Sequence, residues 1–376
     1  MDIIFALLGI VLSGFIIWRS TDGFELASDF LGRRLTKGIK GATINAIASS
    51  MPEFLSTLFF LFYLRKSDGF SGGLGITAGS AIFNILIIPF SIFVVVRLTN
   101  KNAIITLVRQ TMVRDGIALI IITGLLAILI NHGRLNWVDG MLLTAPYLIY
   151  IAWLFISHKK IIGKGENYRY SPLTAKIAVE DYLLINLEKF VLKGKSIGTA
   201  NAWRLLSFST LVMIIGTWLL VYSTDELGKA MDIPLIFISV ILASAASSIP
   251  DTMISIRDAR KGNYEDAFSN ALGSNIFDIS FALGFPLLLY TIFFGSISMD
   301  QQILDASFDI WFALLIITIG TMLIFITGNQ FNTTKAIALA LLYIGFLVFI
   351  YFEIILNINF LNPDTPDNIM DYFRLN

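Results

Sequence analysis

The stretch Ala48-Ser49-Ser50-Met51-Pro52-Glu53 places two hydroxyls, a proline and an acid inside the apolar run from Gly41 to Leu64. The same arrangement returns in the second half of the chain as Ala246-Ser247-Ser248-Ile249-Pro250-Asp251. A charge in the middle of an apolar segment is costly. A costly pattern that occurs twice therefore indicates a duplicated functional element.

The composition around these stretches is that of a membrane protein. Of the 376 residues, 56% are hydrophobic and 14% are charged, against about 25% charged residues in soluble domains. The net charge is zero, so nothing points to nucleic acid, and no protein partner is evident. The absence of cysteine excludes disulfides and thiolate metal sites, and two histidines are too few for a typical histidine metal site. We therefore expect the lipid bilayer as a partner.

The apolar segments predict an all-α polytopic protein with ten transmembrane helices. A helix that crosses the bilayer needs about 20 apolar residues. The predicted spans are 3–18, 40–63, 73–96, 115–131, 137–157, 204–223, 232–256, 265–295, 308–327 and 335–356. Between the fifth and sixth lies a polar interval, 158–203, whose part from Ala178 to Leu192 fits either a helix on the membrane surface or a plain linker.

The basic residues predict the orientation of these spans. With both termini outside, 22 of the 27 lysines and arginines fall in inner loops, as the positive-inside rule requires. The N-terminus has no basic segment or cleavage site of a signal peptide, so residues 3–18 are interpreted as a retained first span.

A second pair of motifs completes an internal repeat. Gly79-Ser80-Ala81-Ile82-Phe83-Asn84 matches Gly273-Ser274-Asn275-Ile276-Phe277-Asp278, and we place the extra residues of the first copy in a loop around Ser71-Gly72-Gly73. Because five is odd, the second half must enter the membrane from the opposite side, which makes two inverted five-helix repeats. The expected domains are 1–157, an inner loop 158–203, and 204–376.

The repeated residues are suited to binding hard cations. Each proline frees a backbone carbonyl four residues earlier, at Ala48 and Ala246. Hydroxyls three and four residues before each acid share its helix face. The predicted site combines three acids, an amide and six hydroxyl residues: Glu53, Asp251, Asp278, Asn84, Ser49, Ser50, Ser247, Ser248, Ser80 and Ser274. Oxygen ligands favour Na⁺ or Ca²⁺ over zinc or copper, and buried acids need cations or protons to compensate them.

These motifs resemble the α-repeats of the sodium/calcium exchangers, in the cation/calcium antiporter superfamily. The family pattern is Gly-Thr-Ser-Leu-Pro-Glu followed by Gly-Ser-Asn-Ile-x-Asn/Asp, and the second copy matches it more closely than the first. The chain departs from it at Ala48 and Ala246, in having serine for threonine, and at Asp251, an aspartate that also occurs in the potassium-dependent branch. Asn45 is a further polar residue with no assigned role.

The resemblance implies a core of helices 2, 3, 7 and 8 around the ions, across which helices 1 and 6 slide as a pair. It implies Ca²⁺ ligands at the carboxylates of Glu53 and Asp251 and at backbone oxygens of Ser49 and Ser247. It implies that Na⁺ also uses the remaining residues of the set, namely Ser50, Ser248, Ser80, Ser274, Asn84 and Asp278.

The expected function is antiport of Na⁺ against Ca²⁺ by alternating access, without a cofactor and without enzymatic activity. The expected location is the plasma membrane, here a prokaryotic inner membrane. Coupling to H⁺ or K⁺ is the alternative that stays open. A more remote alternative is an intramembrane aspartyl enzyme, against which stands the symmetric duplication of the acids.

Overall fold

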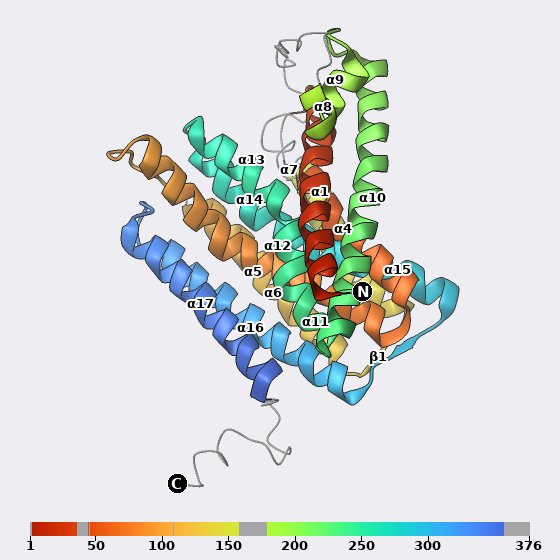
Figure 1. The fold of residues 1–376 in the computed structure, drawn as a ribbon. Coiled ribbons are helices and arrows are strands. Elements are labelled where there is room, and N and C mark those ends of the chain that lie inside the picture. The colour runs from red at the N-terminus through yellow and green to blue at the C-terminus, as the bar shows by residue number, and fades with distance from the viewer. Residues whose placement is uncertain (1, 36–43, 45, 108, 158–178, 357–376) are drawn as a thin grey trace.

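The structure is a computed structural model that describes residues 2–35, 44, 46–107, 109–157 and 179–356, and it is built almost entirely of helices (Figure 1). The long continuous helices are α1 (Ile3–Leu31), α5 (Lys66–Thr99), α6 (Arg109–Ile130), α7 (Trp137–Ser157), α10 (Thr199–Met231), α16 (Gln301–Ile326) and α17 (Thr333–Leu356). A two-residue ribbon pairs β1 (Arg134–Leu135) with β2 (Ile297–Ser298) antiparallel.

Three further segments are interrupted helices. The first comprises α3 (Ala46–Ser49), α4 (Met51–Phe59) and the π-helical η2 (Phe60–Leu64). The second comprises α11 (Leu235–Ile238), η3 (Ser239–Ala243), α12 (Ser244–Ser247) and α13 (Ile249–Arg260). The third comprises α14 (Tyr264–Ile276), η4 (Phe277–Ala282) and α15 (Leu283–Phe294).

The helices give an integral, multi-pass membrane protein. Among the described residues, six helices are long and apolar enough to cross a bilayer, counting α14 to α15 as one, and the second interrupted segment would be a seventh. The ten predicted intervals fall largely on helix wherever they are described. The count of ten spans and the side on which the termini lie stay predictions.

Helices α1 and α10 form an antiparallel pair along one side of the molecule (Figure 1). They approach closely at glycines, because a Cβ added to Gly9 would lie 2.2 Å from Oγ of Ser223. A Cβ added to Gly216 would likewise lie 2.9 Å from Cγ2 of Ile16. Small residues at helix contacts are the usual means of close packing in membranes.

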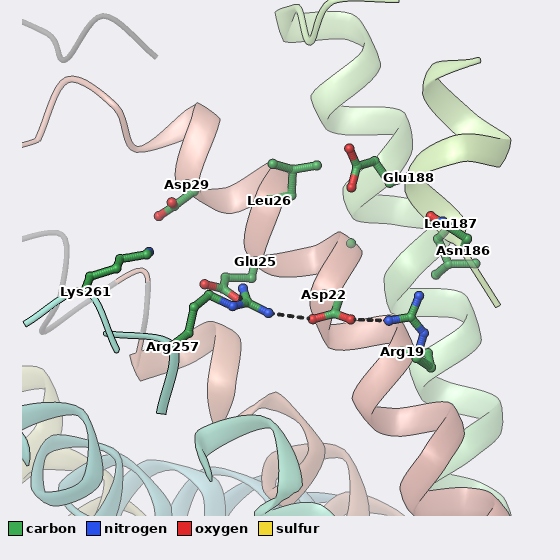
Figure 2. Close-up of a pocket in the computed structure, with 11 residues that line it drawn as sticks. Arg19, Asp22, Glu25, Leu26, Asp29, Asn186, Leu187, Glu188, Arg257 and Lys261 are labelled. Carbon is green, nitrogen blue, oxygen red and sulfur yellow. Dashed lines mark hydrogen bonds and ion pairs between the residues drawn. The ribbon is translucent and has the colours of Figure 1, made fainter. Parts of the chain in front are cut away.

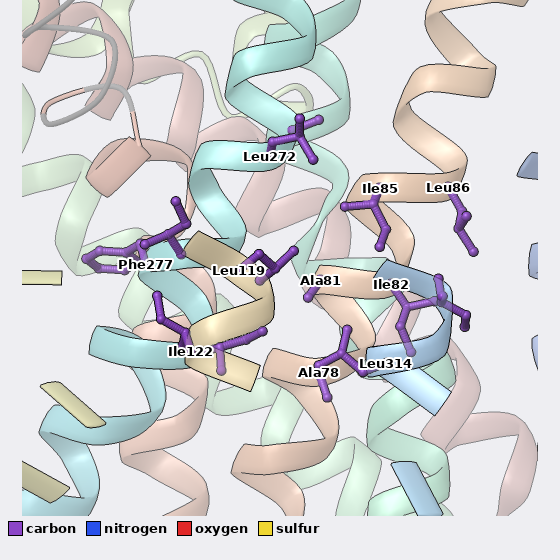
Figure 3. Packing of buried hydrophobic residues seen from close by; sticks show 14 of the residues in the cluster. Ala78, Ala81, Ile82, Ile85, Leu86, Leu119, Ile122, Leu272, Phe277 and Leu314 are labelled. Atoms are coloured by element: carbon purple, nitrogen blue, oxygen red, sulfur yellow. The ribbon is translucent and has the colours of Figure 1, made fainter. Parts of the chain in front are cut away.

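Helix α5 occupies the centre of the remaining bundle. Its residues Ala78 and Ile82 lie in an apolar cluster with side chains of α6, α14 and α16, such as Leu119, Leu272 and Leu314 (Figure 3). On another face, Gly79 approaches η3 so closely that a Cβ there would lie 2.3 Å from the carbonyl oxygen of Val240. This packing fixes α5 against the second interrupted segment.

One local prediction was wrong. Ser71-Gly72-Gly73 is not a loop but lies inside α5, where the missing side chains let it pack on Phe60 and Thr57. The helix that contains the predicted span 3–18 extends beyond it to Leu31, since its last turns bury Ala27 and Phe30 against an apolar cluster that contains Leu205.

The polar interval between the halves holds two short helices in its described part, α8 (Val179–Leu183) and α9 (Leu187–Leu192). Ile185 separates them with a left-handed φ of 47°. Residues 158–178 and Asn45 lie outside the described residues.

Candidate cation-binding site

The two serine–proline–acid motifs break their helices in the same way. Ser50, between α3 and α4, has φ −95° and ψ 9°, and Ser248, between α12 and α13, has φ −81° and ψ 0°. In each copy the proline lies in the first turn of the following helix, where its missing N–H costs no hydrogen bond. Helices α12 and α13 meet at a bend of 41°. The predicted interruption by proline is therefore present in both copies.

The structure brings all ten predicted site residues into the interior. Each of them has an exposed fraction of 0%: Ser49, Ser50, Glu53, Ser80, Asn84, Ser247, Ser248, Asp251, Ser274 and Asp278. They come from α3, α4 and α5 in the first half and from α12, α13, α14 and η4 in the second half. The site is therefore assembled by both copies of the motifs and is closed to solvent.

Ser80 on α5 links two of the acids. Its hydroxyl lies 3.2 Å from Oε1 of Glu53 and 3.2 Å from Oδ2 of Asp278. It also accepts a hydrogen bond of 2.9 Å from the hydroxyl of Ser248. One side chain from the first copy thus contacts acids from both copies.

Asn84, one turn further along α5, contacts the third acid. Its amide nitrogen lies 3.3 Å from Oδ2 of Asp251, 3.1 Å from Oγ of Ser274 and 3.1 Å from Oδ1 of Asn275. The same nitrogen lies 3.4 Å from Oγ of Ser80, and the amide oxygen of Asn84 accepts no hydrogen bond from a described residue.

The serines of the broken turns lie across the boundary between the copies. Ser247 lies beside the carboxylate of Glu53, and Ser49 lies beside that of Asp251. Ser50 lies near Asp278, but its hydroxyl makes no hydrogen bond of good geometry. Each acid thus has polar neighbours from the opposite half of the chain.

Three oxygens in the site lack hydrogen-bond donors among the described residues. They are Oε2 of Glu53, Oδ1 of Asp278 and Oδ1 of Asn84. A buried acceptor without a donor is costly, so such groups call for another partner. A cation with oxygen ligands fits this donor set.

The acids do not form a compact cluster of carboxylates. Within the described part of the chain, no three His, Cys, Asp or Glu side chains are close enough together to hold one metal ion. Hydroxyls and an amide separate the acids instead. An ion bound here would therefore need serine, amide or backbone oxygens besides carboxylates.

Sequence reasoning missed two asparagines beside the site. The amide of Asn275 donates to the carbonyl of Ala81 at 3.0 Å and ties α14 to α5. Asn270 reaches Asp251 and Ser255 from the preceding turn of α14. Asn275 lies inside the second motif, but the equivalent position of the first motif is Ala81. The comparison of the two copies therefore did not mark Asn275 as a polar site residue.

Helices that bury a duplicated set of acids and hydroxyls inside a multi-pass bundle define a membrane protein of the cation-transporter class. The family described as sodium/calcium exchanger protein matches residues 5–156 and 201–352, which is most of the chain. The chain therefore belongs to this family of transporters, as its motifs predicted.

The chain is similar in sequence to a named exchanger, and it shares its fold with solved structures. Human sodium/potassium/calcium exchanger 5 is 25% identical in an alignment 341 residues long, and the match covers 72% of this chain and 66% of that protein. The H⁺/Ca²⁺ exchanger CAX shares the fold with a TM-score of 0.62 at 15% identity, over 92% of this chain and 87% of that one. The sodium-calcium exchanger NCX_Mj, soaked with Na⁺ and Sr²⁺, shares it with a TM-score of 0.56 at 20% identity, over 92% and 98%.

Proposed function

We propose that this protein exchanges Na⁺ for Ca²⁺ across the membrane by alternating access at the site formed by Glu53, Asp251, Asp278 and Asn84. The observation that carries the proposal is the group of three buried oxygens that lack donors, next to acids supplied by both halves of the chain. Family membership supports cation/Ca²⁺ antiport as the class of reaction.

The charge of the site explains why the two ions would exclude each other. Ca²⁺ and Na⁺ both prefer carboxylate, hydroxyl and carbonyl oxygens. If both draw on Glu53 and on the oxygens around Ser80, one load must leave before the other binds. Empty carboxylates in a closed, dry interior are costly, so the loaded site favours the closed state that allows passage between the two sides.

The two halves, 1–157 and 204–376, would supply equivalent broken helices from opposite sides of a plasma membrane. In the prokaryotic setting that we favour, this is the inner membrane. With both termini outside, the basic inner loops would face the cytoplasm.

The test is ion flux in proteoliposomes loaded with Na⁺ and diluted into Na⁺-free medium that contains Ca²⁺. We expect Ca²⁺ uptake that depends on the outward Na⁺ gradient. Absence of uptake under an Na⁺ gradient, with intact protein in the vesicles, would overturn the proposal.

Potassium dependence is a second candidate, favoured by two observations. The chain has aspartate at Asp251 where the pattern of its family has glutamate, and its human relative is named a sodium/potassium/calcium exchanger. Repeating the assay with internal Na⁺ and with or without external K⁺ separates the two cases. Uptake driven by a pH gradient in the absence of Na⁺ would instead indicate proton coupling.

A further inference from the structure

Asp251 is held by amide groups on both of its carboxylate oxygens. Asn84 lies 3.3 Å from Oδ2 and Asn270 lies 3.5 Å from Oδ1. The same nitrogen of Asn270 lies 3.5 Å from the backbone oxygen of Asp251 and donates to the hydroxyl of Ser255 at 3.1 Å. Asn270 is half-buried on α14 and thus joins this helix to α13 directly behind the acid.

The first copy of the repeat lacks this arrangement. The residue four positions before Ser80, matching Asn270 four positions before Ser274, is Ile76, which is buried in an apolar cluster. Glu53 correspondingly keeps Oε2 without a donor, whereas both oxygens of Asp251 have one. The two acids of the duplicated motif are therefore held differently.

We propose that Asn270 is a positioning residue that fixes the carboxylate of Asp251 and thereby sets the affinity of the site for Ca²⁺. This inference deepens the proposed function and rests on it. Groups that orient a metal ligand from behind commonly change metal affinity about 10–100-fold when they are removed. Ca²⁺ takes six to eight oxygen ligands, and the carboxylate of Asp251 would supply part of this set.

The variants Asn270→Ala and Asn270→Asp test this. Both remove the amide donor, and the second keeps the size of the side chain. We expect the Ca²⁺ concentration for half-maximal uptake to rise at least about tenfold, with a maximal rate within about threefold of wild type. The matched control is Ser269→Ala, on the same turn of α14. Ser269 takes no part in the hydrogen bonds that hold Asp251, so this variant should leave both values unchanged.

Direct Ca²⁺ binding to purified protein, measured by calorimetry, separates the possible failures. If wild type and the Asn270 variants bind Ca²⁺ equally, or if only the maximal rate falls, Asn270 does not position Asp251 for Ca²⁺. If wild type binds Ca²⁺ but shows no coupled flux, the proposed function fails while the difference in binding still tests Asn270. Thermal unfolding of each variant verifies that it folds.

An independent observation concerns the contact between α1 and α13. The guanidinium of Arg257 lies 3.1 Å from Oδ1 of Asp22 and 3.0 Å from Oε2 of Glu25. Asp22 also pairs with Arg19 at 2.6 Å. Figure 2 shows these side chains on the wall of a cavity of about 380 Å³. Arg257 thus ties α1 to α13, the helix whose first turn contains Pro250 and Asp251.

The same two helices are in contact near the site. A Cβ added to Gly14 on α1 would lie 3.1 Å from Ile249 on α13 and 3.3 Å from Ala246 on the adjoining α12. Since the site residues are closed to solvent, α1 or another covering helix must move away before an ion can enter or leave. The ion pairs of Arg257 would be broken if α1 separates from α13.

We infer that Arg257, Asp22 and Glu25 form an ion-pair latch that favours the state in which α1 packs on α13. Like the first inference, this one assumes the alternating access of the proposed function. Pairs as exposed as these (45% for the side chain of Arg257) shift an equilibrium only about two- to fivefold each. Such a shift is enough to change the populations of two states of similar energy.

A variant that combines Arg34→Cys, just after the end of α1, with Arg260→Cys, at the end of α13, carries two spin labels. The distance between the labels reports the separation of these two helix ends. The chain has no native cysteine, so the labels are specific. We expect Arg257→Gln to increase the more distant population at least about twofold, and the exchange Arg257→Glu with Glu25→Arg to reverse this. Lys261→Gln is the matched control, because Lys261 lines the same cavity but pairs with Asp258 of its own helix. An unchanged distance distribution in Arg257→Gln would overturn the latch, whatever the flux assay gives.

Discussion

Glu53 is the acid from which we expect the largest effect of a single substitution. Its Oε1 lies near Ser80, and its Oε2 accepts no hydrogen bond from a described residue. Glu53→Gln keeps the shape but removes the charge that both ions would use. Ca²⁺ uptake should fall at least about 100-fold, since even indirect support of a metal ligand is worth about 10–100-fold. Glu226→Gln, at the far end of α10, is the control. Transport by Glu53→Gln at the wild-type rate would refute the site.

The burial of these ten residues in one interior region could be predicted, because local spacing and duplication pointed to the same positions. Their role as ion ligands stays a prediction. Hydroxyls three and four residues before an acid share a helix face whatever the tertiary structure is. The contact of Asn270 with Asp251 depends instead on how α13 packs on α14. No local spacing encodes that contact, and the apolar Ile76 in the first copy hid it from a search for repeats.

Among the elements, the two breaks at the serine–proline motifs could be predicted from the sequence, but the continuity of α5 could not. Proline marks the interruptions at Ser50 and Ser248 directly. Ser71-Gly72-Gly73 also suggests a break, but in a packed membrane bundle glycine serves close approach, and α5 continues through it. The π-helical segments η2, η3 and η4 have no signature in the sequence that we recognise.

The packing of α5 on η3 gives a prediction for this element. A Cβ at Gly79 would lie 2.3 Å from a backbone oxygen that has no freedom to move aside. Gly79→Val should therefore lower stability by about 1–3 kcal/mol, as overpacking usually does. Gly345→Val on α17 is the control, since no described atom lies within 4 Å of a Cβ there. Thermal unfolding in detergent measures both, and equal stability of the two variants would show that α5 and η3 are not packed so tightly.

For the whole molecule, composition and charge distribution indicated a multi-pass membrane protein, and the duplicated motifs indicated the family. The partnership of α1 with α10 followed from the resemblance alone. Neither helix carries a sequence motif that identifies the other as its neighbour, because their contact is made by glycines and apolar residues such as Gly9, Gly216 and Ile16. The pairing of apolar helices that are distant in the sequence depends on the complementary shapes of their surfaces. These shapes are difficult to predict from a single sequence.

The orientation of the whole chain can be tested across α6, a helix with a short apolar stretch from Asp115 to Ile130. Lys101 precedes it and His132 follows it, and both are exposed. If α6 crosses the membrane as predicted, a cysteine replacing His132 should react with an impermeant thiol reagent on intact cells. A cysteine replacing Lys101 should react only after permeabilisation, because the basic loops lie inside. Each variant has a single thiol, since the natural chain has none. Labelling of both positions from the same side would mean that α6 does not span the bilayer. It would also contradict the predicted inverted orientation of the two halves.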